Sequence, residues 1–151
     1  MKKICKIIAI IFLISVSFSA AYAGDVGKDS IPENIIQINK DVFLKKIFNY
    51  EKNSSTWMYE GSTPCLINFY ADWCGPCRRL FPILTEIARE YGDKIVIYRI
   101  NIDSEKELAD TFGIRGVPLT VFIPLNGKPK GVSGLLLKKN IEEIIDSFLL
   151  K

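Results

Sequence analysis

Residues 68–77 read NFYADWCGPC, in which an apolar run stops at Cys74 and Cys77, two cysteines separated by a Gly-Pro pair. The run begins at Cys65 and is interrupted only by Asn68, which is typical of a central strand covered on both faces. The pattern then becomes helical, with apolar residues at spacings of three and four: Leu80, Leu84, Ile87, Ala88 and Tyr91. The sequence therefore predicts a buried strand that passes into a helix at Cys74.

Two cysteines at this spacing can form a metal site, a structural crosslink or a reactive dithiol. A metal site needs three or four ligands, and Cys65 could add a third only from inside a strand in a chain that has no histidine. A disulfide that closes only two intervening residues constrains the unfolded chain very little. The surrounding sequence favours the reactive dithiol without removing the other two uses.

The expected helix start favours reactivity at Cys74. Unpaired N–H groups and the positive end of the helix dipole stabilise a thiolate at this position. Pro76 suits the first turn because its missing N–H has no partner there, and Gly75 leaves the approach to the sulfur open. Cys77, one turn further on, is expected to be more buried and able to reach back to Cys74.

The rest of the chain predicts an α/β fold. Further strands are expected at 35–38, 95–102, 119–123 and 131–133, and further helices at 41–48, 104–112 and 141–149. Residues 49–64 are expected to form a loop, and Asn126-Gly127 is a strong hairpin signal. This order of elements predicts a central mixed β-sheet flanked by helices on both faces.

The first 23 residues have the order of a secretory signal. A start with three lysines precedes the apolar run 7–18, and Ala21-Tyr22-Ala23 supplies the small residues of a cleavage site. We expect cleavage between Ala23 and Gly24, a flexible leader over 24–34, and export to the periplasm or the extracellular space. The alternative is an uncleaved membrane anchor, for which the run falls short of the roughly 20 residues that span a bilayer.

The charge of the chain gives no indication of nucleic acid as a partner. The three lysines of the signal account for the excess of 20 Lys+Arg over 17 Asp+Glu, so the formal net charge of residues 24–151 is zero. The absence of histidine from the sequence also excludes catalytic triads that use imidazole as the base.

Several segments resemble the thioredoxin family. WCGPC at 73–77 matches its active-site motif, GIRGVP at 113–118 is similar to the loop with its cis-proline, and RINID at 99–103 is similar to the strand between them. Asn126-Gly127 and Gly134 lie where the family has its hairpin turn and a late glycine. The resemblance covers 35–151 and implies a thioredoxin fold over this range.

The resemblance also implies roles for individual residues. Cys74 is the attacking thiol and Cys77 the resolving thiol, while Trp73 covers the site as a largely apolar lid. Pro118 is expected to be cis and to lie against the disulfide beside Gly116, which leaves the backbone of Val117 free to pair with an extended substrate segment.

Two residues depart from the family pattern. Asn68 stands where a buried aspartate is usual, and Arg99 stands where a lysine is usual. Because Asn68 cannot titrate, it cannot take a proton from Cys77, and Arg99 is expected to turn toward solvent or toward another acid. Cys65 is expected to be a small buried core residue, the alternative being a slow third thiol.

The resemblance implies a thiol-disulfide oxidoreductase that reduces protein disulfides, with no cofactor and no metal. Its expected partners are disulfide-containing proteins and a membrane protein that donates electrons, and the chain is expected to be monomeric. Two alternatives remain open: an oxidase or isomerase using the same cysteines, and a chaperone-like module that holds extended peptides with little turnover.

Overall fold

The structure, a computed structural model, describes residues 30–151, of which 31–151 form one compact unit. The predicted signal, its cleavage site and most of the predicted leader lie outside the described residues. The end of the leader is fixed, because the Asn34 side-chain amide donates to the carbonyl oxygens of Ala88 at 2.9 Å and Gly92 at 3.0 Å. Within residues 30–151, no helix is both long enough and apolar enough to cross a membrane.

The centre of the fold is a five-stranded mixed sheet in the order β1-β3-β2-β4-β5. Its strands are β1 (Ile35–Gln37), β2 (Cys65–Tyr70), β3 (Val96–Asn101), β4 (Leu119–Ile123) and β5 (Lys130–Ser133). β3 is parallel to both β1 and β2, whereas β4 is antiparallel to β2 and β5. All six residues of β2 are buried, as its continuous apolar sequence predicts for a central strand.

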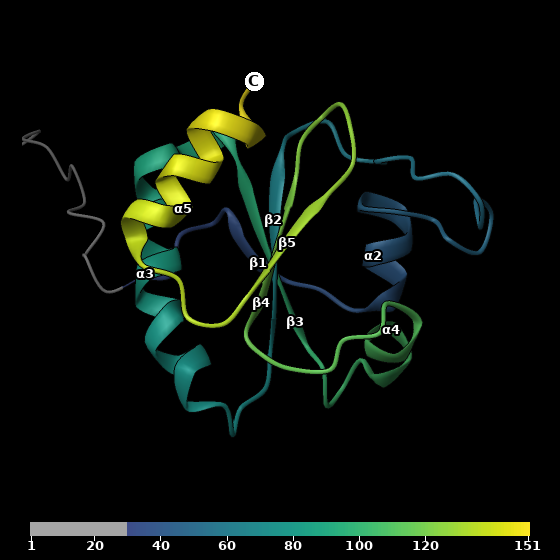
Figure 1. The fold of residues 1–151 in the computed structure, drawn as a ribbon, viewed down its shortest axis with the longest axis horizontal. Helices are drawn as coiled ribbons and strands as arrows, with labels where there is room; N and C mark the ends of the chain where they lie inside the picture. Colours follow the sequence, from purple (N-terminus) through teal and green to yellow (C-terminus); the bar gives the residue numbers. More distant parts are fainter. Residues whose placement is uncertain (1–29) are drawn as a thin grey trace, which may run out of the picture. The chain divides into compact units, whose positions relative to one another are not determined.

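Helices cover both faces of the sheet, with α3 and α5 on one side and α2 and α4 on the other (Figure 1). Their bounds are α2 (Lys40–Lys46), α3 (Gly75–Tyr91), α4 (Lys106–Thr111) and α5 (Lys138–Ile144), followed by a π-helical turn η2 (Ile145–Leu149); a short 3-10 helix η1 (Gly92–Lys94) follows α3. Alternate residues of β2 enter the two cores. Leu66 packs with the α3 and α5 side, whereas Cys65 and Ile67 pack on the opposite side.

The predicted order of elements is confirmed, with small differences at their ends. The predicted helices at 41–48 and 104–112 are shorter, and the last helix begins at Lys138 rather than Ile141. The Asn126-Gly127 turn joins β4 to β5, and Gly127 has a positive φ of 109°, a conformation in which glycine avoids the steric cost of a Cβ.

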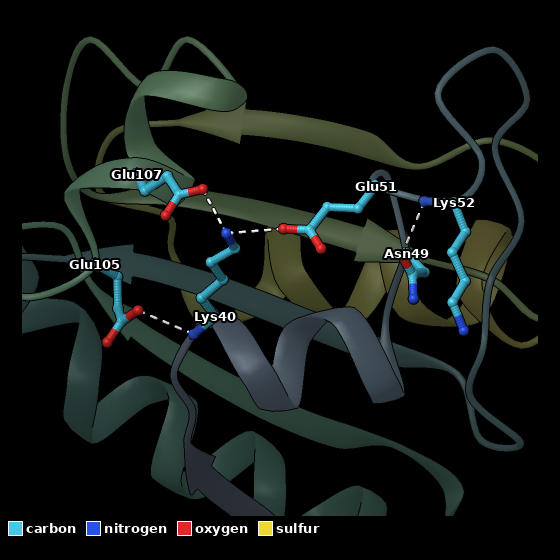
Figure 2. Close-up of polar contacts among 6 residues, drawn as sticks. All are labelled: Lys40, Asn49, Glu51, Lys52, Glu105 and Glu107. Atoms are coloured by element: carbon cyan, nitrogen blue, oxygen red, sulfur yellow. Dashed lines mark hydrogen bonds and ion pairs between the residues drawn. The ribbon is translucent and has the colours of Figure 1, made fainter.

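Lys40 ties together three segments on the α2 side of the sheet (Figure 2). Its ammonium pairs with Glu51 at 2.9 Å and with Glu107, and its backbone N–H donates to Glu105 Oε2 at 2.9 Å. The hydrogen bond with Glu107, followed by that with Glu51, raises the pKa of Lys40. The start of α2, the loop after it and α4 therefore meet at one cation.

Candidate active site

Cys74 and Cys77 form a disulfide at the junction that the sequence predicts. Cys74 is the N-cap of α3, and its Sγ accepts a hydrogen bond from the backbone N–H of Cys77 at 3.1 Å. Gly75 and Pro76 make up the start of the helix, so the missing N–H of Pro76 leaves no bond unmade. A sulfur in this position faces the partial positive charge of the helix start, which favours a thiolate after reduction.

The two cysteine residues do not differ in burial, contrary to the expectation that Cys77 is the more buried. Each cysteine is 3% exposed. The disulfide holds both in one small cluster with Tyr70 and Ala71, against which Ile102 and Val117 pack. In the disulfide form, therefore, residue burial does not distinguish Cys74 from Cys77, whereas the hydrogen bond at the helix start does.

The peptide bond between Val117 and Pro118 is cis, as the resemblance predicts. The carbonyl oxygen of Pro118 accepts a hydrogen bond from the N–H of Gly134 at 2.8 Å, so the loop is fixed to the residue that follows β5. Neither backbone group of Val117 has a backbone partner among residues 30–151. A cavity of about 370 Å³ borders this loop, with Gly116 in its lining.

Trp73, the residue before Cys74, is 68% exposed, so its ring does not pack in the core. Its indole N–H donates to Asp103 Oδ2 at 2.9 Å. The Asn101 side chain accepts from the N–H of Asp103 at 2.9 Å and donates to Asp72 Oδ2 at 3.1 Å. The turn before the cysteines is thus tied to the end of β3.

Sequence reasoning missed Asp72, Asn101 and Asp103 as parts of the site. Asn101 and Asp103 belong to the RINID segment at 99–103, which resembles a strand of the thioredoxin family. Polar residues at the end of a buried strand could have indicated this part of the site, because the carboxyl ends of parallel strands meet at one edge of the sheet.

Arg99 does not turn toward solvent or pair with an acid, and that expectation is wrong. Its guanidinium carbon lies 3.9 Å from the centre of the Tyr70 ring and 4.2 Å from the centre of the Phe81 ring. No Asp or Glu in residues 30–151 forms an ion pair with it. Two aromatic faces contact the guanidinium, which stacks well on rings, and Asp72 attracts it without forming an ion pair. Burial lowers the pKa of Arg99 from its ordinary value.

Asn68 is buried at 1% exposure and occupies the position between Arg99 and Thr120 in the register of the sheet. Asn68 Nδ2, Arg99 Nε and Thr120 Oγ1 are buried atoms without a hydrogen-bond partner among the described residues. These three residues share the sheet face on which α3 packs, since Leu66, Ile97 and Phe122, each two positions away along its strand, belong to that core.

Cys65 is a fully buried free cysteine, as predicted for a small core residue. Burial raises the pKa of its thiol to about 12, against the smaller opposing effect of a hydrogen bond with Tyr59. A thiol with this pKa is protonated near neutral pH, so the structure favours the core role over a third reactive thiol.

Comparison with known proteins agrees with this geometry. The family model described as Thioredoxin matches residues 39–147. Thioredoxin of Borreliella burgdorferi is 37% identical over 113 residues, which cover 75% of this chain and 96% of the relative. A chloroplastic M-type thioredoxin of Zea mays is 31% identical over 118 residues, covering 78% and 70%. The crystal structure of chloroplastic thioredoxin z superposes with a TM-score of 0.62 at 24% identity, covering 75% of this chain and 92% of that one, which supports the fold.

Proposed function

Since the chain belongs to the thioredoxin family, we propose that it reduces protein disulfides in an exported compartment, with Cys74 as the attacking and Cys77 as the resolving thiol. Thiol-disulfide exchange with protein substrates is the chemistry of this family, and the chain is accordingly a thiol-disulfide oxidoreductase. The proposal adds the direction of electron flow, the compartment and the role of each residue.

The observation that carries the assignment of Cys74 is its position as the N-cap of α3. The backbone N–H of Cys77 points at Cys74 Sγ at 3.1 Å in the disulfide form, and the same donor is available to a thiolate after reduction. A hydrogen bond to the charged form of a group, at the positive end of a helix dipole, favours that form. Cys74 is therefore the better nucleophile of the pair.

The reaction proceeds by two exchanges. The Cys74 thiolate attacks one sulfur of the substrate disulfide and expels the other as a thiolate, which leaves a mixed disulfide. The Cys77 thiolate then attacks Cys74 Sγ, the bond to the substrate breaks, and the second substrate sulfur leaves with its electron pair. The substrate disulfide is reduced to two thiols, and the protein leaves with its Cys74–Cys77 disulfide formed.

The loop at Val117 offers a binding edge for the substrate chain. Both backbone groups of Val117 lack a backbone partner among the described residues, and the side chain packs against the cysteine cluster. An extended substrate segment could form strand-like hydrogen bonds here, as peptides do at an exposed sheet edge. Its disulfide would then lie beside Cys74.

Measurement of the reduction potential of the Cys74–Cys77 couple tests the proposed direction. The Gly-Pro pair between the cysteines resembles the reducing members of the family, so we expect a potential near that of thioredoxin, about −270 mV. Equilibration with dithiothreitol or glutathione buffers, followed by mass analysis of alkylated protein, measures it. A potential near that of a strong oxidant, about −120 mV, would assign the chain to disulfide formation instead.

Export and its consequences form the second part of the proposal. The basic start, apolar run and Ala21-Tyr22-Ala23 support cleavage before Gly24. An exported reductase works in an oxidising compartment, so it needs a donor, for which a membrane protein that passes electrons outward is suited, and we expect it to act as a monomer. Peptide mapping of the protein from its native host should find Gly24 as the first residue; recovery of peptides from 7–18 would contradict cleavage.

A further inference from the structure

The resolving step needs a thiolate at Cys77, whose surroundings oppose it. Cys77 is 3% exposed and packs with Tyr70 and Ala71, and burial among such neighbours disfavours a charged sulfur. Asn68 cannot accept the proton as a carboxylate would. Some other group must therefore stabilise the charge on Cys77 when it attacks the mixed disulfide.

A cavity of about 230 Å³ lies beside Cys77 and brings the candidate groups together. The titratable or charged residues in its lining are Tyr70 and Asp72 at the end of β2, Arg78 on α3 itself, and Arg99 on β3. Ile102, the residue after β3, and Val117 pack apolar side chains against the cysteine cluster. These four residues are the candidate side chains in the cavity lining for electrostatic stabilisation of Cys77.

Three of the four are poorly suited to the task. Asp72 is negative and exposed, and its Oδ2 accepts a hydrogen bond from Asn101. Tyr70 is neutral near neutral pH. Arg78 is exposed and donates through Nη1 to the carbonyl oxygen of Asp72 at 3.0 Å, so water screens its charge.

Arg99 has the properties that the others lack. It is half-buried, and the rings of Tyr70 and Phe81 hold its guanidinium in place at 3.9 and 4.2 Å. No carboxylate among the described residues pairs with it, and its buried Nε has no hydrogen-bond partner there. A guanidinium stays protonated near neutral pH even in partly buried positions. Asp72 attracts this guanidinium without forming an ion pair, so the charge of Arg99 is still available beside the cavity that Cys77 lines.

We propose that Arg99 is a positioning residue that acts as a fixed cation and stabilises the Cys77 thiolate during resolution of the mixed disulfide. The inference rests on the proposed function, because it concerns the second of its two exchanges. The Cys77 proton passes to water in the cavity, and the thiolate then attacks Cys74 Sγ. The Cys74–Cys77 bond forms, the bond from Cys74 to the substrate breaks, and the substrate sulfur leaves with the electron pair. Resolution accordingly needs no titratable acid at position 68.

A two-step reagent separates attack from resolution. Reduced protein mixed with excess of a neutral dithiodipyridine releases one thiopyridone when Cys74 attacks and a second when Cys77 resolves, and rapid-mixing absorbance follows both phases across pH. For Arg99→Met we expect the pH midpoint of the second phase to rise by about one unit, since a nearby opposite charge lowers a thiol pKa by about this amount or more. About tenfold less thiolate, offset in part by its greater nucleophilicity, slows the second phase about threefold near neutral pH.

Four controls locate the effect. Arg99→Lys keeps the charge, and its second phase should retain a midpoint near that of wild type. Arg99→Gln provides a second neutral variant if Arg99→Met does not fold, as judged by a thermal melt of the oxidised chain. Arg79→Met removes an exposed charge from α3 outside the cavity lining and should change neither phase. Arg78→Met removes the exposed charge in the lining and should shift the midpoint less than Arg99→Met.

The outcomes distinguish the inference from the function on which it rests. A second phase unchanged in both Arg99→Met and Arg99→Gln would overturn the inference while leaving disulfide exchange intact. A shift in Arg99→Lys equal to that in Arg99→Met would show that ring stacking rather than charge is responsible. A larger shift in Arg78→Met would show that Arg78, not Arg99, supplies the stabilising charge. If the wild-type chain releases no thiopyridone in either phase, the proposed function itself fails.

Discussion

One cysteine begins strand β2 and another follows its end, and the two are almost equally buried in different surroundings. Cys65 opens the strand at 0% exposure, and Cys74 follows its last residue by four positions at 3% exposure. Burial raises the pKa of Cys65 to about 12, whereas Cys74 Sγ accepts a hydrogen bond at the start of α3. Exposure of the whole residue therefore does not distinguish the two cysteines, whereas the position of Cys74 at a helix start does.

Removal of each cysteine should give the largest contrast between the two ends. Cys74→Ser should abolish reduction of a model protein disulfide, because a serine hydroxyl cannot form the mixed disulfide. Cys65→Ala should retain it, since no step uses that sulfur. Turbidity or fluorescence assays of insulin reduction with dithiothreitol as donor measure both variants. Retained reduction in Cys74→Ser would show that another sulfur begins the reaction.

The rates of alkylation should differ by at least about a hundredfold in the fully reduced protein. Near neutral pH a thiol at a helix start is substantially ionised, whereas a thiol whose pKa is about 12 is almost entirely protonated and also shielded. Brief treatment with substoichiometric iodoacetamide, followed by peptide mass spectrometry, gives the order of labelling. After denaturation in guanidinium the difference should disappear. Dominant label on Cys65 in the native protein would contradict the comparison.

Asn68 lies in the middle of β2, and we expect its substitution to have an effect of intermediate size. Asn68→Asp should lower the free energy of unfolding by about 2 kcal/mol near pH 8, because it buries an ionisable group. Burial raises the pKa of such a carboxyl above its unfolded value of roughly 4, so the unfolded state loses its proton first and stability falls as pH rises from there. Denaturant melts of the oxidised protein at pH 4 and pH 8 measure the change.

The same substitution at an exposed residue provides the control for Asn68→Asp. Asn126 lies in the hairpin turn, where aspartate is also a favoured residue, so Asn126→Asp should leave both midpoints close to wild type. Equal midpoints for Asn68→Asp and wild type at both pH values would contradict the burial of an ionisable group at position 68.

The smallest effect is expected at the hydrogen bond between Trp73 and Asp103, which joins the turn before the cysteines to the residues after β3. Asp103→Ala removes the acceptor of the Trp73 indole, an exposed hydrogen bond worth about 1 kcal/mol or less. We expect greater mobility of the Trp73 ring, seen as lower fluorescence anisotropy in a Trp57→Phe background, and disulfide reduction within about twofold of wild type. Unchanged anisotropy would show that Asp103 does not hold the ring.

The order of elements and the position of the disulfide could be predicted from the sequence because both rest on local signals. The continuous apolar run of β2, the three-and-four spacing of α3 and the Asn126-Gly127 turn each involve residues close together in the chain. The cis bond before Pro118 followed from resemblance to a family rather than from local physics. The equal burial of Cys74 and Cys77 was missed, because it depends on side chains brought in from Ile102, just after β3, and from the loop at Val117.

By itself the sequence determined a buried strand that passes into a helix at a Cys-Gly-Pro-Cys turn, and so the chemistry available at that turn. Tertiary structure alone decided the surroundings of the reacting sulfurs. The parallel register of β2 and β3 sets Asn68 beside Arg99, and α3 brings Phe81 onto the guanidinium that Tyr70 already contacts. Such contacts depend on strand register and helix packing between segments distant in the chain, and a burial pattern constrains which face a residue takes but not which neighbours it meets there.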